Sequence, residues 1–465
     1  MAQAGTAATR LKRVFISNRG EIAIRIARAA SGLGMESVAI YAAADKFGLH
    51  TSFATRAVEV GGGGSNTSDP VGAYLDAPAL IQAAKAAGCD CVHPGYGFLA
   101  ENAAFAEMCA ATGLTFVGPS PEALSLFGDK VRARAFASSL GIPVVPGSNG
   151  ALATADEALA VAGELGYPVM LKASAGGGGR GMRLVERPAE MADAFLRCRG
   201  EATAAFGDGS LFLEKVIVRP RHIEVQILGD AQGNVVHLHE RDCSVQQRNQ
   251  KVIEIAPAPG LDQALRERIQ ADAIKLARAA AYVNAGTVEF LVAPEQGEYW
   301  FIECNPRVQV EHTVTEQVTG VDIVEAQFQL AAGASLASLG LGDQDAVGSP
   351  RGFAVQARVV ATAPGTITAY KEPSGPGVRV DGCGYVGYAP PPQFDPLLAK
   401  VIGASNSTGS FVSAVERTLR ALDEFHIAGL PANVGHLRAM LLHPLVRAGD
   451  ARTTFLGEHP ELAGG

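Results

Sequence analysis

Residues 167–185 contain the most informative pattern in the chain: Tyr167-Pro-Val-Met-Leu-Lys172, then Gly176-Gly-Gly-Gly-Arg-Gly181, then Met182-Arg-Leu-Val185. Two short apolar segments flank a glycine-rich tip, which predicts two strands joined by a flexible hairpin. The glycine spacing also matches the dinucleotide fingerprint, but that fingerprint requires a following helix whose N-terminus receives the pyrophosphate. A strand follows here, so we exclude nicotinamide binding. We predict a phosphate flap beside the positive charge of Lys172, with a plain flexible linker as the alternative.

The size and composition of the chain restrict its class. A chain of 465 residues exceeds what one hydrophobic core supports, so we expect two or three lobes. The net charge of -8 is spread without long runs of either sign, which argues against a nucleic-acid or anionic-membrane partner. Seven irregularly spaced cysteines indicate a reducing compartment, and neither a bilayer-length apolar stretch nor an apolar signal core is present. We therefore expect a cytoplasmic protein.

Three lobes account for the order of predicted elements. Residues 13–40 read as strand, turn and helix, and similar patterns around residues 91–97 and 114–118 predict an open parallel sheet. Ligands of such sheets lie beyond the carboxyl ends of the strands. Residues 143–150 mark a lobe boundary, and the glycine run at 61–64 is interpreted as a surface loop. Short strands and then longer strands alternating with helices follow.

Two glutamates are expected to oppose each other in a second hairpin. Residues 286–292 and 299–303 read as strands joined by a short loop that contains Gly297. If Ala293 faces Tyr299, Glu289 lies opposite Glu303, with Cβ atoms about 5 Å apart. Such like charges are stable together when a hard cation such as Mg²⁺ lies between them. Two solvated glutamates are the alternative.

Polar residues alternate with apolar ones after this hairpin: Glu303, Asn305, Arg307, Gln309 and Glu311. A period of two places them on one face. We assign Glu303 and Asn305 to a metal end. Arg307 offers a fork of donors to a small planar oxyanion, Gln309 adds a donor, and Glu311 is the candidate base. Pro306 makes a regular strand doubtful, so part of this row is expected to be loop.

Several motifs together resemble a known superfamily. Gly128-Asp-Lys130, Lys172, the glycine-rich flap, Glu289 and Glu303-x-Asn305 resemble the ATP-grasp enzymes, in which two lobes hold ATP. Five longer motifs look like the biotin carboxylases, and this resemblance covers nearly the whole chain. They are Ser17-Asn-Arg-Gly-Glu-Ile-Ala, His93-Pro-Gly-Tyr-Gly-Phe-Leu, Arg221-His-Ile-Glu-Val-Gln, Glu240-Arg-Asp-Cys-Ser and Arg307-Val-Gln-Val-Glu-His312. Four more look most like the first domain of pyruvate carboxylases: Gly118-Pro-Ser-Pro, Phe206-Gly-Asp-Gly-Ser210, Val252-Ile-Glu-Ile-Ala-Pro257 and Glu311-His-Thr-Val-Thr-Glu.

The resemblance implies an α/β chain with an ATP-grasp fold. It implies an N-terminal Rossmann-like open-sheet lobe at 10–127, a linker and ATP-grasp lid with the flap at 128–216, and an ATP-grasp core with a C-terminal α+β lobe at 217–460. The implied reaction is ATP- and bicarbonate-dependent carboxylation of biotin through carboxyphosphate, with two Mg²⁺ or Mn²⁺ ions. Biotin would be attached to a separate carrier domain or protein.

The resemblance also assigns roles to individual residues. The ATP pocket would contain Lys130, Lys172, Gly177, Gly178, Gly179, Glu214, Lys215, Val216, His222, Glu224 and Gln246, with Glu214 to Val216 as the adenine hinge. Bicarbonate would be bound by Lys251, Arg307, Gln309 and the backbone of Val310. The catalytic residues would be Glu311 as the base, Arg379 facing biotin, Lys251 and Arg307; the metal ligands would be Glu289, Glu303 and Asn305.

Some features depart from the family pattern. Asn249 stands where His is usual, Gln247 replaces an arginine, and the loop after the strand containing Arg358 is shorter, which is expected to alter a subunit contact. His237-x-His239 is interpreted as a solvated face of a strand in preference to a metal pair, and Cys89-x-Cys91 as a buried pair.

The expected partners lie outside these residues. Since no biotin attachment sequence of the Ala-Met-Lys-Met type occurs, we expect carrier and carboxyltransferase parts in other domains or subunits, and a homodimer or higher assembly. Two rival functions stay open: another ATP-grasp ligase that joins a carboxylate to an amine, and a non-catalytic nucleotide-binding module. Arg379 and the segment 93–99 argue against the first, and Lys251, Glu311 and the paired glutamates argue against the second. The final carboxyl acceptor is not determined by these patterns.

Overall fold

The computed structural model describes residues 10–61, 69–174, 181–406 and 408–463. The N-terminal lobe contains a five-stranded parallel sheet in the order β3-β2-β1-β4-β5, which confirms the predicted open parallel sheet. Its strands are β1 (Arg13–Ile16), β2 (Glu36–Tyr41), β3 (Arg56–Glu59), β4 (Cys91–His93) and β5 (Thr115–Phe116). Its helices are α1 (Gly20–Gly32), α2 (His50–Phe53), α3 (Ala77–Ala86), α4 (Ala103–Ala111) and α5 (Pro121–Phe127).

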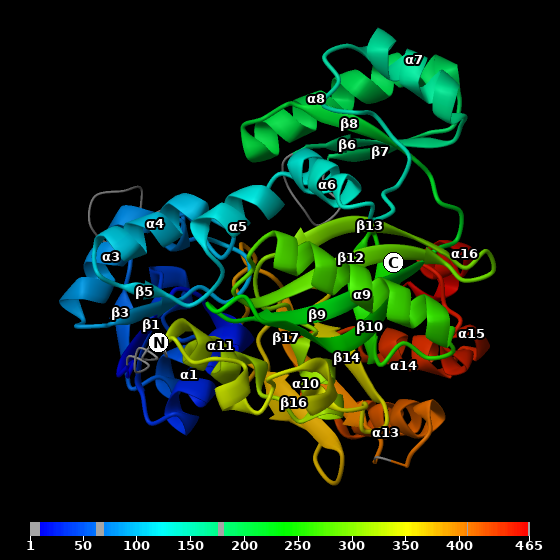
Figure 1. Cartoon of the computed structure of the whole chain (residues 1–465). Coiled ribbons are helices and arrows are strands. Elements are labelled where there is room, and N and C mark those ends of the chain that lie inside the picture. The colour runs from blue at the N-terminus through cyan, green and yellow to red at the C-terminus, as the bar shows by residue number, and fades with distance from the viewer. Residues whose placement is uncertain (1–9, 62–68, 175–180, 407, 464–465) are drawn as a thin grey trace.

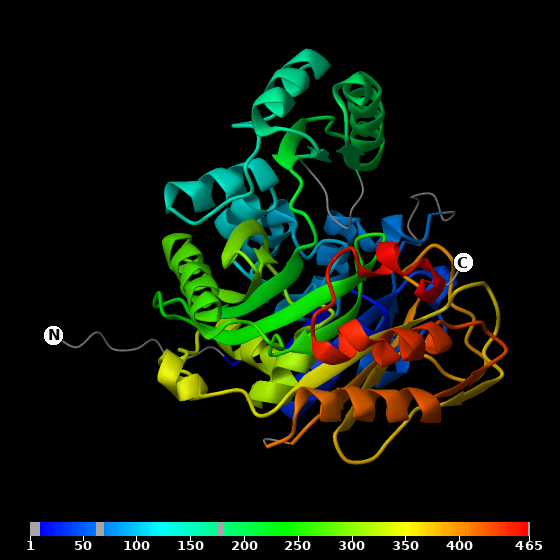
Figure 2. The ribbon, with the colours of Figure 1, turned by 90° about the vertical axis from the view of Figure 1, so that its right-hand side faces the viewer.

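A small lobe, here called the lid (residues 128–216), stands apart above the rest of the chain from residue 155 onward (Figures 1 and 2), while Ala133 and Ala137 near its start pack into the apolar cluster of the large sheet. Its antiparallel sheet has the order β7-β6-β8. The elements are α6 (Lys130–Ser139), α7 (Ala155–Leu165), β6 (Val169–Ala173), β7 (Met182–Val185), α8 (Met191–Phe206) and β8 (Leu211–Lys215). The pairing of β6 with β7 confirms the predicted hairpin, whose tip at 175–180 lies outside the described residues.

One eight-stranded antiparallel sheet runs through the remaining chain in the order β13-β12-β9-β10-β11-β14-β17-β16. Its strands are β9 (Arg221–Gly229), β10 (Val235–Gln247), β11 (Gln250–Ala256), β12 (Asn284–Ala293), β13 (Glu298–Asn305), β14 (Ala354–Val360), β16 (Val378–Gly382) and β17 (Leu397–Ala404). Strands β15 (Ala369–Lys371) and β18 (His426–Ala428) form a separate pair. The helices are α9 (Gln263–Ala279), α10 (His312–Thr319), α11 (Ile323–Ala331), α12 (Gln344–Val347), α13 (Phe411–Glu424), α14 (Val434–Leu442), α15 (Pro444–Ala448) and α16 (Phe455–Glu458).

The apolar packing joins the N-terminal lobe to the large sheet. Ile22 and Ile26 of α1 share a buried cluster with Leu228 of β9, Ala285 of β12 and Phe328 of α11. The lid has a separate apolar cluster built from α7, α8 and its own sheet. A continuous core therefore joins the N-terminal lobe and the lobe of the large sheet into one body, which carries the lid.

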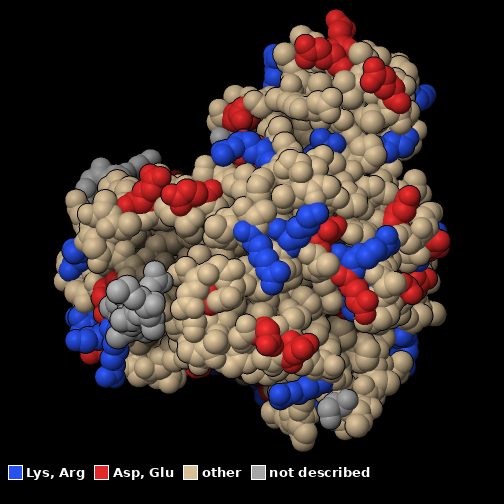
Figure 3. Space-filling model, viewed as in Figure 1, with Lys and Arg blue, Asp and Glu red and all other residues tan. Residues whose placement is uncertain are grey.

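Residues 143–147 connect the lid to the edge of the large sheet. The backbone N–H of Phe301 in β13 donates to the carbonyl oxygen of Pro143 at 2.7 Å, and that of Lys215 in β8 donates to Pro146 at 2.7 Å. The stretch expected to be a lobe boundary thus hydrogen-bonds to both sides. On the face shown in Figure 3, basic and acidic side chains are interspersed in small groups.

The hairpin of β12 and β13 corrects one prediction and confirms another. Ala293 pairs with Glu298 and Val292 with Tyr299, so the predicted pairing of Ala293 with Tyr299 is wrong by one residue. A bulge at Ile302 shifts the register back, and Glu289 does lie opposite Glu303. The turn at residues 294–297 is tighter than expected because Gly297 adopts a φ of 65°, and the extra residue of the bulge compensates for it.

The alternating row is a strand only as far as Asn305. Pro306 has no N–H to donate to a sheet, and the chain continues as loop until α10 begins at His312. The period-two placement of Arg307, Gln309 and Glu311 is therefore wrong, as the doubt over Pro306 indicated. Their side chains are positioned by tertiary contacts.

Candidate active site

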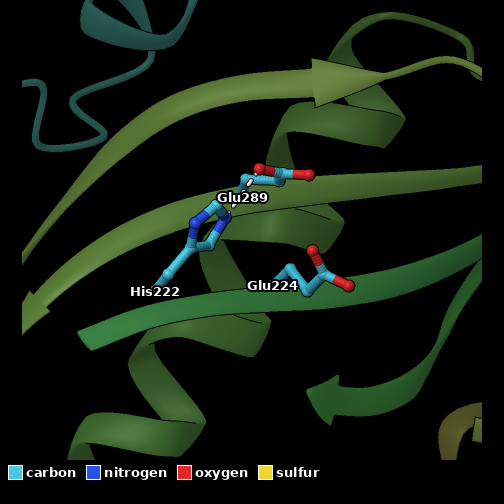
Figure 4. Close-up of side chains that lie close together, drawn as sticks. All are labelled: His222, Glu224 and Glu289. Atoms are coloured by element: carbon cyan, nitrogen blue, oxygen red, sulfur yellow. Dashed lines mark hydrogen bonds and ion pairs between the residues drawn. The ribbon is translucent and has the colours of Figure 1, made fainter. Parts of the chain in front are cut away.

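Three glutamates form a row across neighbouring strands of the large sheet. Glu224 of β9 lies opposite Glu289 of β12, and Glu289 lies opposite Glu303 of β13. His222 is on the same face of β9 as Glu224, and its ring points toward the carboxylate of Glu289 (Figure 4). Since like charges this close repel, the row needs positive partners.

Glu289 is saturated by such partners. Its Oε1 accepts hydrogen bonds from Lys251 Nζ at 2.9 Å, Asn305 Nδ2 at 2.8 Å and Gln309 Nε2 at 2.7 Å, and its Oε2 lies 2.6 Å from His222 Nε2. Burial alone would raise the pKa of Glu289, but Lys251 and His222 hold it well below its usual range. Burial likewise opposes the charge of His222, yet Glu289 raises its pKa. The carboxylate is therefore ionised.

The nucleotide end of the site, defined here as Glu303 with Lys130, Lys172 and Glu214, is more open. Lys130 Nζ, at the start of α6, lies 2.8 Å from Glu303 Oε2, and about a quarter of each side chain is exposed. Burial would raise the pKa of Glu303, and the ammonium of Lys130 lowers it. Within the lid, Lys172 forms an ion pair with Glu214. Lys130 thus bridges the lid and the large sheet.

Other predicted nucleotide residues occupy both sides of this opening. Lys215 Nζ donates to the carbonyl oxygen of Gly166 at 2.8 Å, and the backbone N–H of Val216 donates to Pro168 at 3.3 Å. His222 Nδ1 lies 2.8 Å from Gln246 Nε2 on the sheet side. The roles predicted for Gly177, Gly178 and Gly179 lie outside the described residues.

The base end, defined here as Glu311 with Lys251, Glu224, Arg241 and Arg358, is almost closed to solvent. Lys251 Nζ lies 2.5 Å from Glu224 Oε2 and 2.8 Å from Glu311 Oε1, besides its contact with Glu289. Arg358 Nη2 lies 3.0 Å from Glu311 Oε2. Burial would raise the pKa of Glu311, but Lys251 and Arg358 hold it well below its usual range. An anion that draws these cations away would make Glu311 more basic.

Arg241, which the sequence patterns did not single out as a site residue, organises this end. Its buried guanidinium donates to the side-chain oxygens of five residues: Glu224 at 2.5 Å, Gln226 at 2.8 Å, Thr315 at 2.9 Å, Thr287 at 3.1 Å and Gln309 at 2.7 Å. Because Oε1 of Gln309 accepts from Arg241, Nε2 is the end of the amide that faces the site as a donor. The orientation of Gln309 is therefore set by a residue behind it.

A second arginine and its partner were also missed. Arg358 Nε lies 2.5 Å from Glu254 Oε1, and Gln356 Nε2 donates to Glu254 Oε2 at 2.9 Å. Burial raises the pKa of Glu254, and Arg358 opposes that shift. A charged residue between apolar neighbours in strands β11 and β14 was the only available signal, and it does not reveal the partner.

Arg307 and Arg379, two predicted catalytic residues, contact side chains outside the base end. Arg307 Nε donates to Glu101 Oε1 at 2.6 Å and Nη2 donates to Asn305 Oδ1 at 2.9 Å. Arg379 in β16 donates to Asp381 through Nε at 2.9 Å and Nη2 at 2.8 Å, and through Nη1 to Glu316 of α10 at 2.7 Å. Arg379 thus reaches α10, the helix that follows Glu311.

The donor set fits a hard cation at Glu289, Glu303 and Asn305. These side chains offer carboxylate and amide oxygens, which Mg²⁺ and Mn²⁺ prefer. Two other groups of ligand atoms lie close together, one of His222, Glu224 and Glu289 (Figure 4) and one of Glu224, Cys243 and Glu311. In each of these groups Lys251 contacts both carboxylates, whereas in the predicted cation set it contacts only Glu289, so we assign neither group to a metal.

The paired histidines, the paired cysteines and the turn that contains Asn249 lie outside the site. His237 is buried, because a bulge and a positive φ at His239 distort β10, so the solvated face is wrong for that residue. His239 Nε2 lies 2.9 Å from the carbonyl oxygen of Gly348. Cys89 and Cys91 are buried free thiols, as expected. Asn249 is in a two-residue turn with Arg248, and Gln247 Nε2 donates to the carbonyl oxygen of Ala463 at 2.6 Å.

Comparisons with known families cover almost the whole chain. The biotin carboxylase N-terminal domain matches residues 10–124, the ATP binding domain of the carbamoyl-phosphate synthase L chain matches 129–339, and the biotin carboxylase C-terminal domain matches 356–458. Pyruvate carboxylase of Aspergillus niger is 46% identical over 99% of this chain, and pyruvate carboxylase 1 of Caenorhabditis elegans is 48% identical over 97%. The chain spans 39% and 38% of the lengths of those two relatives.

Solved structures of biotin carboxylases and of a pyruvate carboxylase are also similar to this chain. The biotin carboxylase domain dimer of Hydrogenobacter thermophilus 2-oxoglutarate carboxylase, in complex with MgADP, ADP and bicarbonate, has a TM-score of 0.92 and 41% identity over 98% of this chain and 99% of its own. The Campylobacter jejuni biotin carboxylase in its β,γ-ATP complex has a TM-score of 0.91 and 40% identity over 97% and 99%. Rhizobium etli pyruvate carboxylase has a TM-score of 0.93 and 44% identity over 98% of this chain and 41% of its own.

These matches confirm the predicted ATP-grasp fold. Within the described residues, none of the helices is long and apolar enough to cross a membrane. From its three matching domains and its near-complete overlap with solved relatives, the chain belongs to the biotin carboxylase family.

Proposed function

We propose that the chain uses ATP and bicarbonate to carboxylate biotin. The observation that carries this function is the base end: an ionised, buried Glu311 that shares Lys251 with two further glutamates and is flanked by Arg358. In this cluster Lys251 and Arg358 supply positive charge for a small anion directly beside Glu311, which can act as its base. The relatives support it, since one neighbour is described with MgADP, ADP and bicarbonate bound.

In the proposed mechanism, Lys251, Gln309, Arg307 and the backbone of Val310 bind bicarbonate, and Glu311 removes its proton. The bicarbonate oxygen then attacks the terminal phosphorus of ATP, which releases ADP and forms carboxyphosphate. When bound at Glu289, Glu303 and Asn305, divalent cations would neutralise charge on the transferring phosphoryl group. Lys130 and Lys172 bind phosphate oxygens, and His222, Gln246 and the stretch from Glu214 to Val216 complete the nucleotide pocket. Glu224, predicted for the same pocket, lies at the base end beside Arg241 and Lys251.

In the second half-reaction, carboxyphosphate breaks to CO₂ and phosphate. The phosphate takes the ureido proton of biotin, and Arg379 stabilises the negative charge left on the ureido oxygen. The ureido nitrogen then attacks CO₂ to give carboxybiotin. Closure of the lid over the site would exclude water from the intermediate.

Several finer assignments are part of the proposal. Lobes at 10–127, 128–216 and 217–460 would act as the open-sheet domain, the lid, and the core with its C-terminal lobe. Carrier and carboxyltransferase parts would accept the carboxyl group, and Rhizobium etli pyruvate carboxylase is itself described as complete and multifunctional. Pyruvate is the favoured final acceptor because the curated relatives named above are pyruvate carboxylases, with an acyl-CoA as the alternative.

The assembly and the location are also proposals. A homodimer is favoured because the Hydrogenobacter thermophilus domain is described as a dimer. The cysteine usage favours the cytoplasm, although the relatives from mouse and rat are named as mitochondrial.

The direct test is phosphate release from MgATP with and without bicarbonate and biotin. We expect cleavage to require bicarbonate, and carboxybiotin to form only when biotin is added. Equal cleavage in bicarbonate-free buffer would contradict the proposal. Cleavage that requires another carboxylate together with an amine would instead support a carboxylate–amine ligase, and nucleotide binding without cleavage would support a non-catalytic module.

A further inference from the structure

Arg134 lies on α6, where the large sheet meets the lid. Its helix packs on the large sheet, because Ala133 and Ala137 share an apolar cluster with residues of β9, β12 and β13. The guanidinium of Arg134 reaches the other way: Nη2 donates to the carbonyl oxygen of Val145 at 2.6 Å, and Nη1 donates to that of Ser148 at 2.8 Å. One side chain therefore connects α6 to the segment that leads into the lid.

The segment held by Arg134 pairs with β8, the strand that carries Glu214. The backbone N–H of Ser148 donates to the carbonyl oxygen of Leu213 at 2.8 Å. Gly147 forms an isolated bridge with Glu214, and a Cβ atom on Gly147 would lie 2.3 Å from the carbonyl oxygen of Leu213. Only glycine allows the two backbones to approach this closely. Arg134 is thus held directly beside the strand of the proposed adenine hinge.

Glu214 has a cation beside each of its carboxylate oxygens. Its Oε2 forms the ion pair with Lys172, and its Oε1 lies 3.7 Å from Arg134 Nε. The side chain of Glu214 is only 6% exposed, and those of Lys172 and Arg134 are 17% and 15% exposed. Because little water reaches the carboxylate, these two neighbours are the main source of stabilisation for its negative charge.

The two cations differ in their freedom to exchange partners. Both terminal nitrogens of Arg134 are engaged with backbone carbonyls, and its planar guanidinium is fixed by them. Within the described residues, Lys172 Nζ has one ion-pair partner, Glu214, and a lysine side chain is flexible. Since the proposed function assigns Lys172 to a phosphate oxygen of ATP, phosphate competes with Glu214 for this ammonium.

Arg134 has a donor available when that competition occurs. Among the described residues, the buried Nε of Arg134 donates to no acceptor, and Glu214 Oε1 lies just beyond hydrogen-bond range, at 3.7 Å. A small movement of the Glu214 side chain toward Arg134 completes this bond as Lys172 turns to the phosphate. The carboxylate then keeps a charged partner throughout nucleotide binding.

We propose that Arg134 is a positioning residue that holds Glu214 in the adenine hinge and compensates its charge when phosphate draws Lys172 away. This inference rests on the nucleotide site of the proposed function. It follows that Arg134 supports binding of the phosphate groups more than binding of the adenosine group. A residue that only braced the lid would support both parts of the nucleotide equally.

The test compares Arg134→Met with the parent by titration with MgADP and with adenosine, neither of which undergoes the reaction. We expect the Kd of MgADP to rise about tenfold to a hundredfold, the range that corresponds to loss of a hydrogen bond to a charged group. The Kd of adenosine, measured by its competition with MgADP, should stay near the parent value, because Lys172 remains with Glu214 when no phosphate is present.

Arg132→Met is the matched control. Arg132 is exposed on the same helix and donates to Ser125, so both dissociation constants should stay at the parent values. Arg134→Lys keeps the charge and should lose less MgADP affinity than Arg134→Met; it also carries the comparison of the two ligands if Arg134→Met fails to fold. In the background of Glu214→Gln no carboxylate needs a partner, so adding Arg134→Met should cause little further loss.

The outcomes separate this inference from the proposed function. A loss confined to MgADP, smaller in Arg134→Lys and absent in the Glu214→Gln background, supports the role of Arg134. Equal losses for MgADP and adenosine, no loss for either ligand, or a full loss in the Glu214→Gln background would overturn it. Cleavage of ATP by the parent without any need for bicarbonate would overturn the proposed function, and the titrations would still decide the role of Arg134 because neither ligand reacts.

Discussion

The nucleotide end joins the lid to the large sheet, whereas the base end lies on the large sheet and the segment before α10, and the two ends pair their charges differently. At the nucleotide end, Lys130 meets Glu303 in a single ion pair, with 23% and 25% of the two side chains exposed. At the base end, Lys251 contacts three carboxylates, and the guanidinium of Arg241 is completely buried among five acceptors.

The difference indicates that ligands rearrange the side chains of the nucleotide end, whereas the side chains of the base end are already in place before a ligand binds. A partly exposed ion pair is worth about 0–1 kcal/mol, so phosphates and cations can replace Lys130 and Glu303 as each other's partners at small cost. A buried network is electrostatically stronger and strongly disfavours any unpaired member. The base end is therefore organised before bicarbonate arrives, and the nucleotide end becomes organised around its ligand.

The largest effect is expected for Glu311→Gln. Removing the base should lower bicarbonate-dependent ATP cleavage by about 10²–10⁴-fold, the usual contribution of general acid–base catalysis. Nucleotide affinity should stay at the parent value, because Glu311 contacts Lys251 and Arg358 at the base end. Single-turnover phosphate release and nucleotide titration measure the two quantities. A matching loss of nucleotide affinity would show that the two ends are not separate.

Arg241→Met should have the next largest effect, through Gln309. With Arg241 gone, the amide of Gln309 is no longer held with Nε2 toward the site, so the KM for bicarbonate should rise about tenfold to a hundredfold, as hydrogen bonds to charged groups are worth about 1.5–3 kcal/mol. Steady-state kinetics at varied bicarbonate checks this.

A double-mutant cycle with Gln309→Met gives the control for that experiment. If Arg241 acts by orienting Gln309, the two changes together should raise the KM by less than the product of the single effects. Fully multiplicative effects would assign Arg241 a different role.

A smaller effect is expected in the pH dependence of the free energy of unfolding, which reports on the buried side chains behind the base end. Burial lowers the pKa of His312, behind Glu311, to about 3, although Glu316 opposes this. Its Nδ1 lies 2.6 Å from the carbonyl oxygen of Gln309, and Glu316, Lys400, Arg25 and Arg379 surround it. The unfolded chain protonates this histidine near pH 6.5 while the folded chain does not, so stability is full above about pH 6.5 and falls as the pH drops toward 3.

His312→Gln should flatten that slope by about 1.4 kcal/mol per pH unit between pH 6 and pH 5. The carboxylate of Glu316, whose pKa is held below its usual range, loses its contribution only at lower pH. Denaturant unfolding at several pH values measures the slope. An unchanged slope would mean that His312 is protonated in the folded chain and that the base end is less closed than described.

The smallest effect is expected for Asn249→His, which restores the residue usual in the family. Asn249 has a φ of 63° in the turn between β10 and β11, a conformation that both asparagine and histidine adopt more readily than most residues. Turnover should stay within about tenfold of the parent, a change of at most about 1.4 kcal/mol. A larger gain would mark the nucleotide end as impaired in this chain.

Local patterns in the sequence were reliable where neighbouring residues determine the outcome. The antiparallel pairing of β6 with β7 and the parallel N-terminal sheet follow from apolar periodicity interrupted by glycines. The opposition of Glu289 and Glu303 was also predicted, although through a wrong register. A tighter turn and the bulge at Ile302 offset each other, and no side-chain pattern announces a bulge.

Patterns failed where a distant contact overrides the local one. The alternation from Glu303 to Glu311 indicated a strand face, but Pro306 ends the strand, and Gln309 and Glu311 are placed by Arg241 and Lys251. His237 was interpreted as solvated, yet Gln344, which is 107 residues away, covers its backbone.

The order of residues alone therefore determined the parallel N-terminal sheet, the hairpin of β6 and β7 and the opposition of Glu289 and Glu303, because these depend on short-range periodicity, whereas the ATP-grasp fold was predicted from the resemblance of whole motifs. It did not determine which cation meets which carboxylate. Arg241 and Gln309 are 68 residues apart and Lys400 and Val310 are 90 apart, and they meet because β10 and β17 belong to the sheet on which the segment before α10 packs. Partner choice among buried charges follows from that packing, since each buried charge is stable only beside a partner that the fold brings within a few ångströms.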